Sequence, residues 1–353
     1  MPSMTFGLDT LRQHVTRKVG LVGLVLGMSM AMPVAQAAEG EVNIYSMRQA
    51  YLIEPILDEF TKETGVKVNV LFADDGLIER LAQEGPNSPA DVVLTSSFGN
   101  TARLVDEGLT QPVDSETLAA RVPEQFRAAD NRWFALTLRA RLFYTSKERM
   151  KEGDLVTYEG LADPKWKGKV CTRSGTHPYN VQMIAAMIAH KGKAETKTWL
   201  EGVKANLARK PQGNDRAQVK AVSEGECDIA VGNSYYFFKM LDNDEQRGWA
   251  EAVNPVFPKF DGGGTHVNVS AMVMAPHAPN RENAVLLMEY LTGEAAQRIY
   301  ADVNFEYPVN PNVKPSDALA GIGDLTPDSL TLDQIAANLR DALQLVAEVG
   351  YNE

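Results

Sequence analysis

The sequence predicts an α/β protein made of two doubly wound lobes. Along most of the chain, short apolar segments typical of strands alternate with amphipathic segments typical of helices. This alternation indicates sheets covered by helices on both faces. The 353 residues exceed what one hydrophobic core usually holds, which indicates two lobes with a cleft between them. The expected boundaries are 1–37 for a signal peptide, 38–137 plus about 263–313 for the first lobe, and 138–262 plus about 314–353 for the second.

The first lobe is predicted from its alternating pattern. Residues 91–95 form a continuous apolar run, which is typical of a buried parallel strand. Residues 52–64 carry apolar side chains at helical spacing, with Pro55 expected near the first turn and Gly65 as the stop signal. In chain order, strands and helices are expected in turn at 41–45, 52–64, 66–70, 77–84, 91–95 and 102–107.

The second lobe is expected to repeat the pattern between two crossing strands. Residues 133–145 form a long extended run that is expected to leave the first lobe and enter the second. Residues 265–274 alternate apolar and polar side chains and are expected to return as a strand. Other strands are expected at 169–172 and 228–231, and helices at 180–191, 194–207, 216–223, from 234, and at 282–291, 294–301 and 332–347.

The N-terminal 37 residues have the pattern of a signal peptide. Basic residues precede an apolar stretch of 14 residues at 19–32, which is short for a membrane span. A small-x-small site ends at Ala37, so cleavage is expected near Ala37 or Ala38 and the mature protein is expected in the periplasm. An uncleaved N-terminal anchor is the alternative.

The charge of the chain disfavours one class of function. There are 46 acidic against 35 basic residues, which gives a net charge of −11. Removing the expected leader takes away three basic residues and one acidic residue, so the mature chain is more negative still. An acidic, exported protein is a poor candidate for binding nucleic acid.

Two cysteines, Cys171 and Cys227, each stand just before a segment that holds candidate site residues. In an oxidising compartment they are expected to form a disulfide that joins the two site-bearing strands. Two buried free thiols are the alternative. Two cysteines are too few for a cysteine-rich metal site.

Three tyrosines are the strongest candidates for a ligand site. Tyr235 and Tyr236 are adjacent and follow the strand at 228–231, and Tyr179 lies 56 residues upstream, after the strand at 169–172. Each segment has the pattern of a strand that ends in a turn before a helix, so the phenols are expected to meet in the cleft. Phenolate oxygens are hard ligands that suit a hard trivalent cation, Fe³⁺ above all. The alternative is that the tyrosines are ordinary packing residues of amphipathic helices.

Groups suited to an anion accompany the tyrosines. Three phenolates would neutralise Fe³⁺ and leave coordination positions for water or a small anion such as carbonate. Ser174 and Thr176 belong to a hydroxyl-rich turn that opens the helix of Tyr179, and helix N-termini stabilise anions. Arg48 and Arg139 stand where strands should reach the cleft, and arginine binds carboxylate or carbonate in a bidentate manner. The alternative for either arginine is a surface salt bridge.

Four further residues are weaker candidates for the cleft. Gln49 and Tyr51 follow the first strand, and Tyr51 is expected to point either into the cleft or into the core. Arg141 shares a strand face with Arg139 but is expected to make structural pairs in the second lobe. His266 lies in the returning strand, where it could line the cleft.

Signatures of several other classes are missing from the sequence. It has no Gly-x-Ser-x-Gly elbow, no P-loop, no EF-hand loop and no clustered histidines at zinc spacing. Neither a nucleophile–base pair nor a pair of carboxylates stands out, so an enzyme is not expected. A purely structural envelope protein is disfavoured by the many strand–helix units and the expected cleft.

Together these motifs resemble those of the periplasmic ferric-ion-binding proteins that serve ABC-type iron importers. The resemblance covers essentially the whole mature chain. Its most specific part is the tyrosine pair with the third tyrosine upstream. The motifs that carry it lie at 42–49, 139–141, 166–170, 174–180 and 232–236.

This resemblance implies the two-lobed architecture of class II periplasmic binding proteins, with a hinge and a central cleft. It also implies that the three tyrosines bind iron, and that the two arginines and two hydroxyl residues above hold a synergistic carbonate or bicarbonate. Several members have a His or a His-Tyr pair after the first strand. This chain has Arg48, Gln49, Ala50 and Tyr51 there, which places it in a subgroup with three tyrosines and an exogenous anion.

The resemblance further implies a monomer that delivers iron to an ABC transporter permease in the inner membrane, driven by an ATPase, without catalysis. The nearest alternative is the same fold with another small ligand, such as a polyamine, an oxyanion or thiamine.

Overall fold

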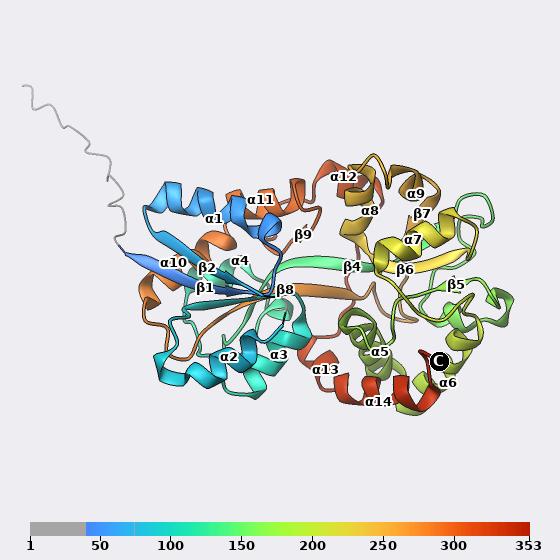
Figure 1. Ribbon diagram of the computed structural model, residues 1–353, viewed down its shortest axis with the longest axis horizontal. Coiled ribbons are helices and arrows are strands. Elements are labelled where there is room, and N and C mark those ends of the chain that lie inside the picture. The colour runs from blue at the N-terminus through green and yellow to red at the C-terminus, as the bar shows by residue number, and fades with distance from the viewer. Residues whose placement is uncertain (1–39, 74) are drawn as a thin grey trace, which may run out of the picture. The chain divides into compact units, whose positions relative to one another are not determined.

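The computed structural model describes residues 40–73 and 75–353. The expected signal peptide lies outside these residues. Across them, no helix is both long and apolar enough to cross a membrane. From residue 40 onward the described chain forms one compact unit, in which strands and helices alternate along most of the length (Figure 1).

A mixed sheet of nine strands runs through the described residues. At one end, β1 (Glu41–Ser46) pairs in parallel with both β2 (Lys67–Phe72) and β3 (Val92–Thr95). Every residue of β3 is buried, as its continuous apolar run predicted. The order along the sheet is β2, β1, β3, β8 (Val267–Met274), β4 (Phe134–Ser146), β6 (Ile229–Asn233) and β5 (Val170–Cys171).

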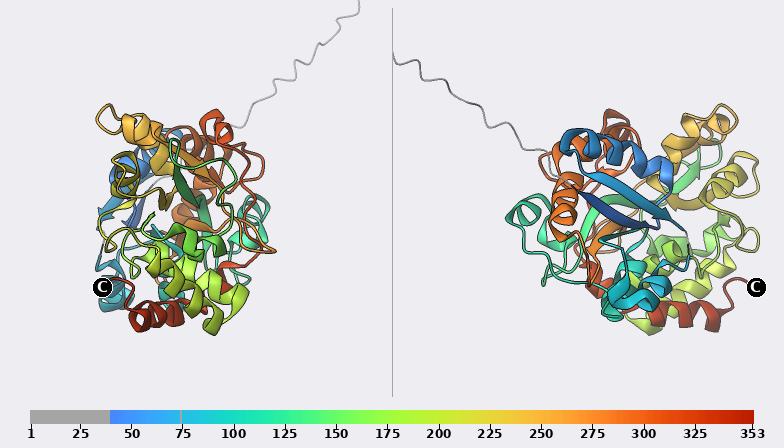
Figure 2. Two further views of the ribbon diagram at one scale, coloured as in Figure 1. Left: turned by 90° about the vertical axis from the view of Figure 1, so that its right-hand side faces the viewer. Right: turned by 60° about the vertical axis from the view of Figure 1, so that its left-hand side comes forward.

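Helices lie on both sides of the β1–β2–β3 end (Figure 2). The first of them, α1 (Ala50–Thr64), buries an apolar stripe and ends at Gly65, which adopts φ 78° as a left-handed cap. Because α1 begins earlier than expected, Pro55 lies in its second turn rather than near the first. The other helices of this end are α2 (Leu77–Glu84), α3 (Phe98–Asp106), α4 (Glu116–Arg121), α10 (Arg281–Leu291) and α11 (Glu294–Asp302).

Strands β4 and β8 connect the two ends of the sheet, and they run side by side through the middle of Figure 1. From Phe134 to Ala140, β4 pairs antiparallel with β8, and from Arg141 to Thr145 it pairs with β6. All 13 residues of β4 are buried. The two predicted crossing strands are therefore confirmed. Two short strands, β7 (Val253–Val256) and β9 (Tyr307–Pro308), also pair with β4.

The β5–β6 end carries its own set of helices. They are α5 (Pro178–Lys191), α6 (Lys193–Ala205), α7 (Asp215–Ser223), α8 (Ser234–Leu241), α9 (Arg247–Glu251) and α12 (Asp317–Gly321). The single helix predicted at 332–347 is wrong, because the structure has α13 (Leu332–Ala336) and α14 (Leu339–Val349). Asn338 separates them, and its side-chain amide donates to the carbonyl of Gln334 at 2.9 Å. Asparagine competes in this way with regular helical hydrogen bonds.

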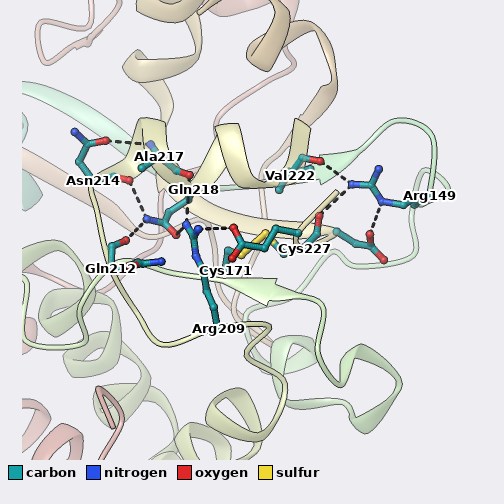
Figure 3. Close-up of a disulfide and its surroundings, with 11 residues drawn as sticks. Arg149, Cys171, Arg209, Gln212, Asn214, Ala217, Gln218, Val222 and Cys227 are labelled. Carbon is teal, nitrogen blue, oxygen red and sulfur yellow. Dashed lines mark hydrogen bonds and ion pairs between the residues drawn. A yellow bond between two sulfur atoms is a disulfide. The ribbon is translucent and has the colours of Figure 1, made fainter. Parts of the chain in front are cut away.

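The predicted disulfide between Cys171 and Cys227 is confirmed (Figure 3). Cys171 ends β5, and Cys227 precedes β6, the parallel neighbour of β5. The Arg149 guanidinium lies beside the bridge and donates to the carbonyl oxygens of Val222 and Cys227, at 2.7 and 3.1 Å. The disulfide thus joins the end of β5 to the segment just before β6, and each of these strands leads into a tyrosine segment.

Replacing both cysteines by alanine should lower the free energy of unfolding by about 2–4 kcal/mol, because the bridge closes a loop of 56 residues in the unfolded chain. Urea unfolding followed by circular dichroism measures the change. A reductant should destabilise the wild type by a similar amount and leave the double variant unaffected. Equal stability of wild type and variant without reductant would contradict this role.

Candidate metal and anion site

The three candidate tyrosines lie where two strands of the sheet give way to helices. Tyr235 and Tyr236 are in the first turn of α8, directly after β6, and Tyr179 is the second residue of α5. All three side chains are half-buried. The rings of Tyr235 and Tyr236 are tilted by 35°, with centroids 4.2 Å apart. The predicted placement at strand–helix transitions is therefore what the structure shows.

The start of α5 is fixed by two neighbours of Tyr179. The Nδ1 atom of His177 accepts a hydrogen bond from the backbone N–H of Tyr179, at 3.2 Å. Burial, reinforced by Arg173, lowers the pKa of His177 to about 4, so the ring is neutral and free to accept. The amide of Asn180 donates to the carbonyls of Arg173 and Ser174, which closes the preceding turn. The orientation of Tyr179 is thus set by its local sequence.

The phenols act on one another electrostatically. The pKa of Tyr235 is raised well above its ordinary value by burial, and then by the neighbouring phenols of Tyr179 and Tyr236. Burial and Tyr179 likewise raise the pKa of Tyr236. The three tyrosines are therefore near enough to interact electrostatically, and a bound cation would be needed to remove the protons of Tyr235 and Tyr236 at neutral pH.

Arginines surround the ring of Tyr179. The guanidinium carbons of Arg139, Arg141 and Arg173 lie 5.7, 5.7 and 5.3 Å from its ring centroid. Contacts of this length are within the range of cation–π attraction. These guanidiniums also place positive charge where a phenolate would form. The three arginines, two from β4 and one from the segment before Tyr179, therefore favour negative charge on the site.

Arg141 belongs to a buried network around Asp215. Its Nη1 lies 2.7 Å from Oδ2 of Asp215, and its Nη2 donates to Oδ1 of Asn180 at 2.7 Å. Arg173 reaches the other oxygen of Asp215 at 3.1 Å. Burial alone would raise the pKa of Asp215, but Arg141 and Arg173 hold it below its ordinary value, so the carboxylate is ionised. The structural pairs expected of Arg141 are present, and they tie β4, α5 and α7 together.

Arg48 and Arg139 share a second buried network. Arg48 donates to the hydroxyl of Ser270 and to Oε2 of Glu306, the latter at 2.6 Å. Arg139 donates to the same hydroxyl at 2.8 Å and to the carbonyl of Ser96, and its Nη1 is 3.8 Å from Oε1 of Glu306. Neither arginine makes the surface salt bridge that was the alternative. Both guanidiniums already have partners within the protein, and their role toward an anion remains a prediction.

The turn that holds Ser174 and Thr176 is also engaged. The two hydroxyls are 2.8 Å apart, and the backbone N–H of Gly175 donates to Oδ1 of Asn352 at 2.8 Å. A Cβ at Gly175 would come within 2.6 Å of the Tyr351 ring, so only glycine allows the C-terminal residues to pack this closely. The C-terminal segment therefore supports the turn and uses one of its donors.

The weaker candidates divide into two groups. Gln49 and Tyr51 are exposed at the start of α1, and Tyr51 is 52% exposed, so it is not a core residue. The Tyr51 ring lies 5.9 Å from Nζ of Lys239 on α8, which places it near the helix of the tyrosine pair. His266 is buried instead beside Tyr158 and Phe260, and burial together with Arg141 lowers its pKa to about 3.

The arrangement carries more positive than negative charge. Four guanidiniums contact a ring of the three tyrosines, and a fifth shares a carboxylate with one of those four. In the described part of the chain, only two carboxylates pair with these five guanidiniums. The guanidiniums are those of Arg48, Arg139, Arg141, Arg173 and Arg216, and the carboxylates are those of Asp215 and Glu306. Three phenolates would balance this excess of three charges. A trivalent cation bound by those phenolates would restore the excess and favour a further anion.

Sequence reasoning missed several of these residues. Arg173 directly precedes the predicted turn and could have been found from that position. Glu306 and Asp215 could not, because long-range packing brings them to the site. Among the residues that the structure describes, no group of three or more His, Cys, Asp or Glu side chains could hold a metal ion. Within that part of the chain, the phenols are the candidate ligands.

Comparisons with known proteins identify the family of the chain. A family model described as bacterial extracellular solute-binding protein matches residues 56–322. Iron uptake protein A1 of Synechocystis sp. (strain ATCC 27184 / PCC 6803 / Kazusa) is 41% identical over 330 residues, which cover 92% of each chain.

Solved structures agree as well. Ferric iron-binding protein A of Mannheimia haemolytica, in an open conformation, is 52% identical with a TM-score of 0.85, over 89% of this chain and 100% of that one. A Trichodesmium protein in complex with iron and citrate ligands is 39% identical with a TM-score of 0.85, over 88% of this chain and 100% of the other. These matches confirm the predicted two-lobed fold and the resemblance to ferric-ion-binding proteins. The chain therefore belongs to the family of bacterial extracellular solute-binding proteins.

Proposed function

We propose that this protein binds Fe³⁺ through Tyr179, Tyr235 and Tyr236 and delivers it to an ABC transporter. The observation that carries the proposal is the convergence of three half-buried phenols at two strand–helix transitions. The printed names of relatives support the metal, since they include iron uptake and Fe(3+)-binding periplasmic proteins.

The chemistry of binding follows from the donor set. The raised pKa values of Tyr235 and Tyr236 keep these phenols neutral in the free protein at neutral pH, and Fe³⁺ displaces phenol protons as it binds. Phenolate oxygens are anionic and hard, which suits a trivalent ion better than the divalent ions of most protein sites. The excess of guanidinium charge then favours carbonate or bicarbonate as a synergistic anion. A citrate ligand accompanies iron in the Trichodesmium relative.

Residues around the tyrosines support this site. Arg48 and Arg139 are proposed to act on the bound anion through their charge, while their hydrogen bonds keep them on Glu306 and Ser270. Ser174 and Thr176 stand at the entrance to α5, where a small anion would meet a helix N-terminus. The strands β4 and β8 are the proposed hinge between lobes at 38–137 plus about 263–313 and 138–262 plus about 314–353.

The family and the relatives are solute-binding transport proteins, and some relatives are periplasmic by name. The proposed cellular role is therefore that of a receptor without catalytic activity. After export and loss of residues 1–37, a monomer would carry iron in the periplasm to a permease of the inner membrane and its ATPase.

An oxyanion is the second candidate ligand, and one observation favours it. Five guanidiniums around two carboxylates would attract an anion without any metal. The same charge disfavours the cationic alternatives, a polyamine or thiamine. A relative at 24% identity is named as a putative 2-aminoethylphosphonate-binding protein. Calorimetric titration with phosphate or a phosphonate in iron-free solution tests this candidate directly.

Tyr→Phe substitution at each of the three positions should weaken ferric binding by more than about 100-fold. Changes to groups that merely support a metal ligand typically cost 10–100-fold, so loss of a ligand should cost more. Competitive dialysis against a chelator, with metal analysis, measures the affinity.

The matched control for these variants is Tyr290→Phe, since Tyr290 lies on α10 and packs against Phe60. It should bind iron like the wild type. Unchanged affinity in all three site variants would remove the tyrosines from the site.

Ferric affinity should fall steeply as pH falls. Because their pKa values are raised, Tyr235 and Tyr236 are protonated throughout the neutral range, and iron must displace their protons at any pH below those values. Each proton released weakens binding about tenfold for every unit by which the pH drops. Iron retention against a fixed chelator between pH 7.5 and 5.5, corrected for protonation of the chelator, gives the number of protons. An affinity independent of pH would rule out phenolate ligands.

A further inference from the structure

We propose that Arg216, assisted by Lys239, is the residue that binds the anion accompanying the iron. This inference rests on the proposed function. It assigns the principal anion contact to Arg216 on α7 and Lys239 on α8, beside the tyrosine pair, rather than to Arg48 and Arg139.

Arg216 lies directly against the tyrosine pair. It is in the first turn of α7, and its guanidinium carbon is 5.4 Å from the ring centroid of Tyr236. The preceding residue, Asp215, is committed to Arg141 and Arg173. Arg216 therefore reaches the site without a carboxylate of its own.

The guanidinium of Arg216 differs from the other four in its bonding. Arg48, Arg139, Arg141 and Arg173 each bind a carboxylate or hydroxyl of the protein. Within residues 40–73 and 75–353, the Arg216 side chain makes no hydrogen bond or ion pair. The Nε atoms of all five guanidiniums are buried without a partner, so Arg216 differs in that its two terminal nitrogens also have none. A buried donor without a partner is costly, typically about 1–3 kcal/mol, and an anion would satisfy it.

Lys239 extends the same positive surface. It lies on α8 beyond the tyrosine pair, and its ammonium donates to the carbonyl of Val303 at 2.8 Å. An ammonium has three donors, so two remain for another ligand. Burial lowers the pKa of Lys239, and the charge of Arg216 lowers it further, whereas Asp242 and Glu306 raise it. Burial raises the pKa of Tyr51, and the charge of Arg216 opposes that rise. An anion bound between Arg216 and Lys239 would relieve the repulsion between these two cations.

This geometry selects a class of anion. The planar fork of a guanidinium matches two oxygens of one oxyanion, and the ring of Tyr236 beneath it keeps the fork oriented. The ligand should therefore be a carbonate or carboxylate that offers two oxygens to Arg216 and others to the metal. Carbonate and a polycarboxylate such as citrate share this chemistry and are separated by the experiment.

The experiment measures how much anion each variant needs to bind iron. Iron is added as ferrous chloride and oxidised by CO₂-free oxygen in a buffer without bicarbonate or other oxyanions, and the phenolate-to-iron absorption is followed while bicarbonate, or separately citrate, is added. Arg216→Gln should raise the half-saturating anion concentration by about 10–100-fold, the range of a charged hydrogen bond. Lys239→Gln should raise it less, and Arg216→Lys should recover part of the loss because the charge is kept.

A second readout separates anion binding from a general effect of charge. At saturating anion, Arg216→Gln should regain nearly the full iron absorption, because only the anion contact was lost. A loss of absorption that excess anion does not restore would overturn the proposal. The matched control is Arg247→Gln, an exposed arginine on α9 paired with Asp244, which should behave like the wild type. Thermal unfolding of the iron-free variants should change little, since Arg216 makes no hydrogen bond or ion pair within the described chain, and its contact with the Tyr236 ring is the interaction to be lost.

The outcomes distinguish this inference from the proposed function. An effect of Arg216→Gln with bicarbonate supports carbonate as the ligand, and an effect with citrate alone supports a polycarboxylate. Unchanged anion dependence in Arg216→Gln overturns the inference and leaves the tyrosine site intact. A wild type that develops the absorption without any anion also overturns it. If the wild type shows no absorption under any condition, the proposed function itself fails.

Discussion

The balance of charge around three phenols is the constraint on which the site depends. Two buried carboxylates, Asp215 and Glu306, hold four arginines in place by ion pairs, three of them at 2.6–3.1 Å and that of Arg139 at 3.8 Å. Removing either carboxylate would leave buried guanidiniums unpaired, a change that typically costs about 3–5 kcal/mol. The arginines are therefore held next to the tyrosines by groups of the protein itself, without a ligand. Their excess charge favours phenolates and, once a trivalent cation is bound, a further anion. In the proposed site, the bound cation would therefore restore the positive excess that the phenolates remove, and the anion would balance it.

The fold brings these charges together through one strand and one strained residue. Alternate residues of β4, Arg139 and Arg141, enter the two networks, so a continuous buried strand sets their spacing. Phe305 adopts φ 57°, which is unfavourable for a bulky side chain. It stacks on Phe238 of α8 at 5.1 Å, and the next residue supplies the Glu306 carboxylate. The left-handed backbone at Phe305 therefore accompanies two contacts: the stacking of Phe305 on Phe238 of α8, and the ion pair between Glu306 and Arg48.

Much of this could be predicted from the sequence, and the rest could not for physical reasons. The strands, the crossing segments and the disulfide follow from apolar patterns and cysteine positions, which are local signals. The tyrosines were identified because they follow apolar strands directly. Glu306 meets Arg48 across 258 positions, and no local pattern signals such a pair. The split at Asn338 depends on one side-chain hydrogen bond, which the periodicity of 332–347 does not reveal. Arg216 lies in a helix that was predicted, but its missing partner is visible only in three dimensions.

The most direct test of the account is a visible absorption titration of the mature protein with ferric citrate, with and without bicarbonate. If the three tyrosines bind the iron, a red-to-purple phenolate-to-iron band should appear and saturate at one iron per chain. The band should disappear when a stronger chelator removes the metal. If no band forms although iron binds in stoichiometric amounts, the metal is held by groups other than tyrosine. That result would contradict the central claim.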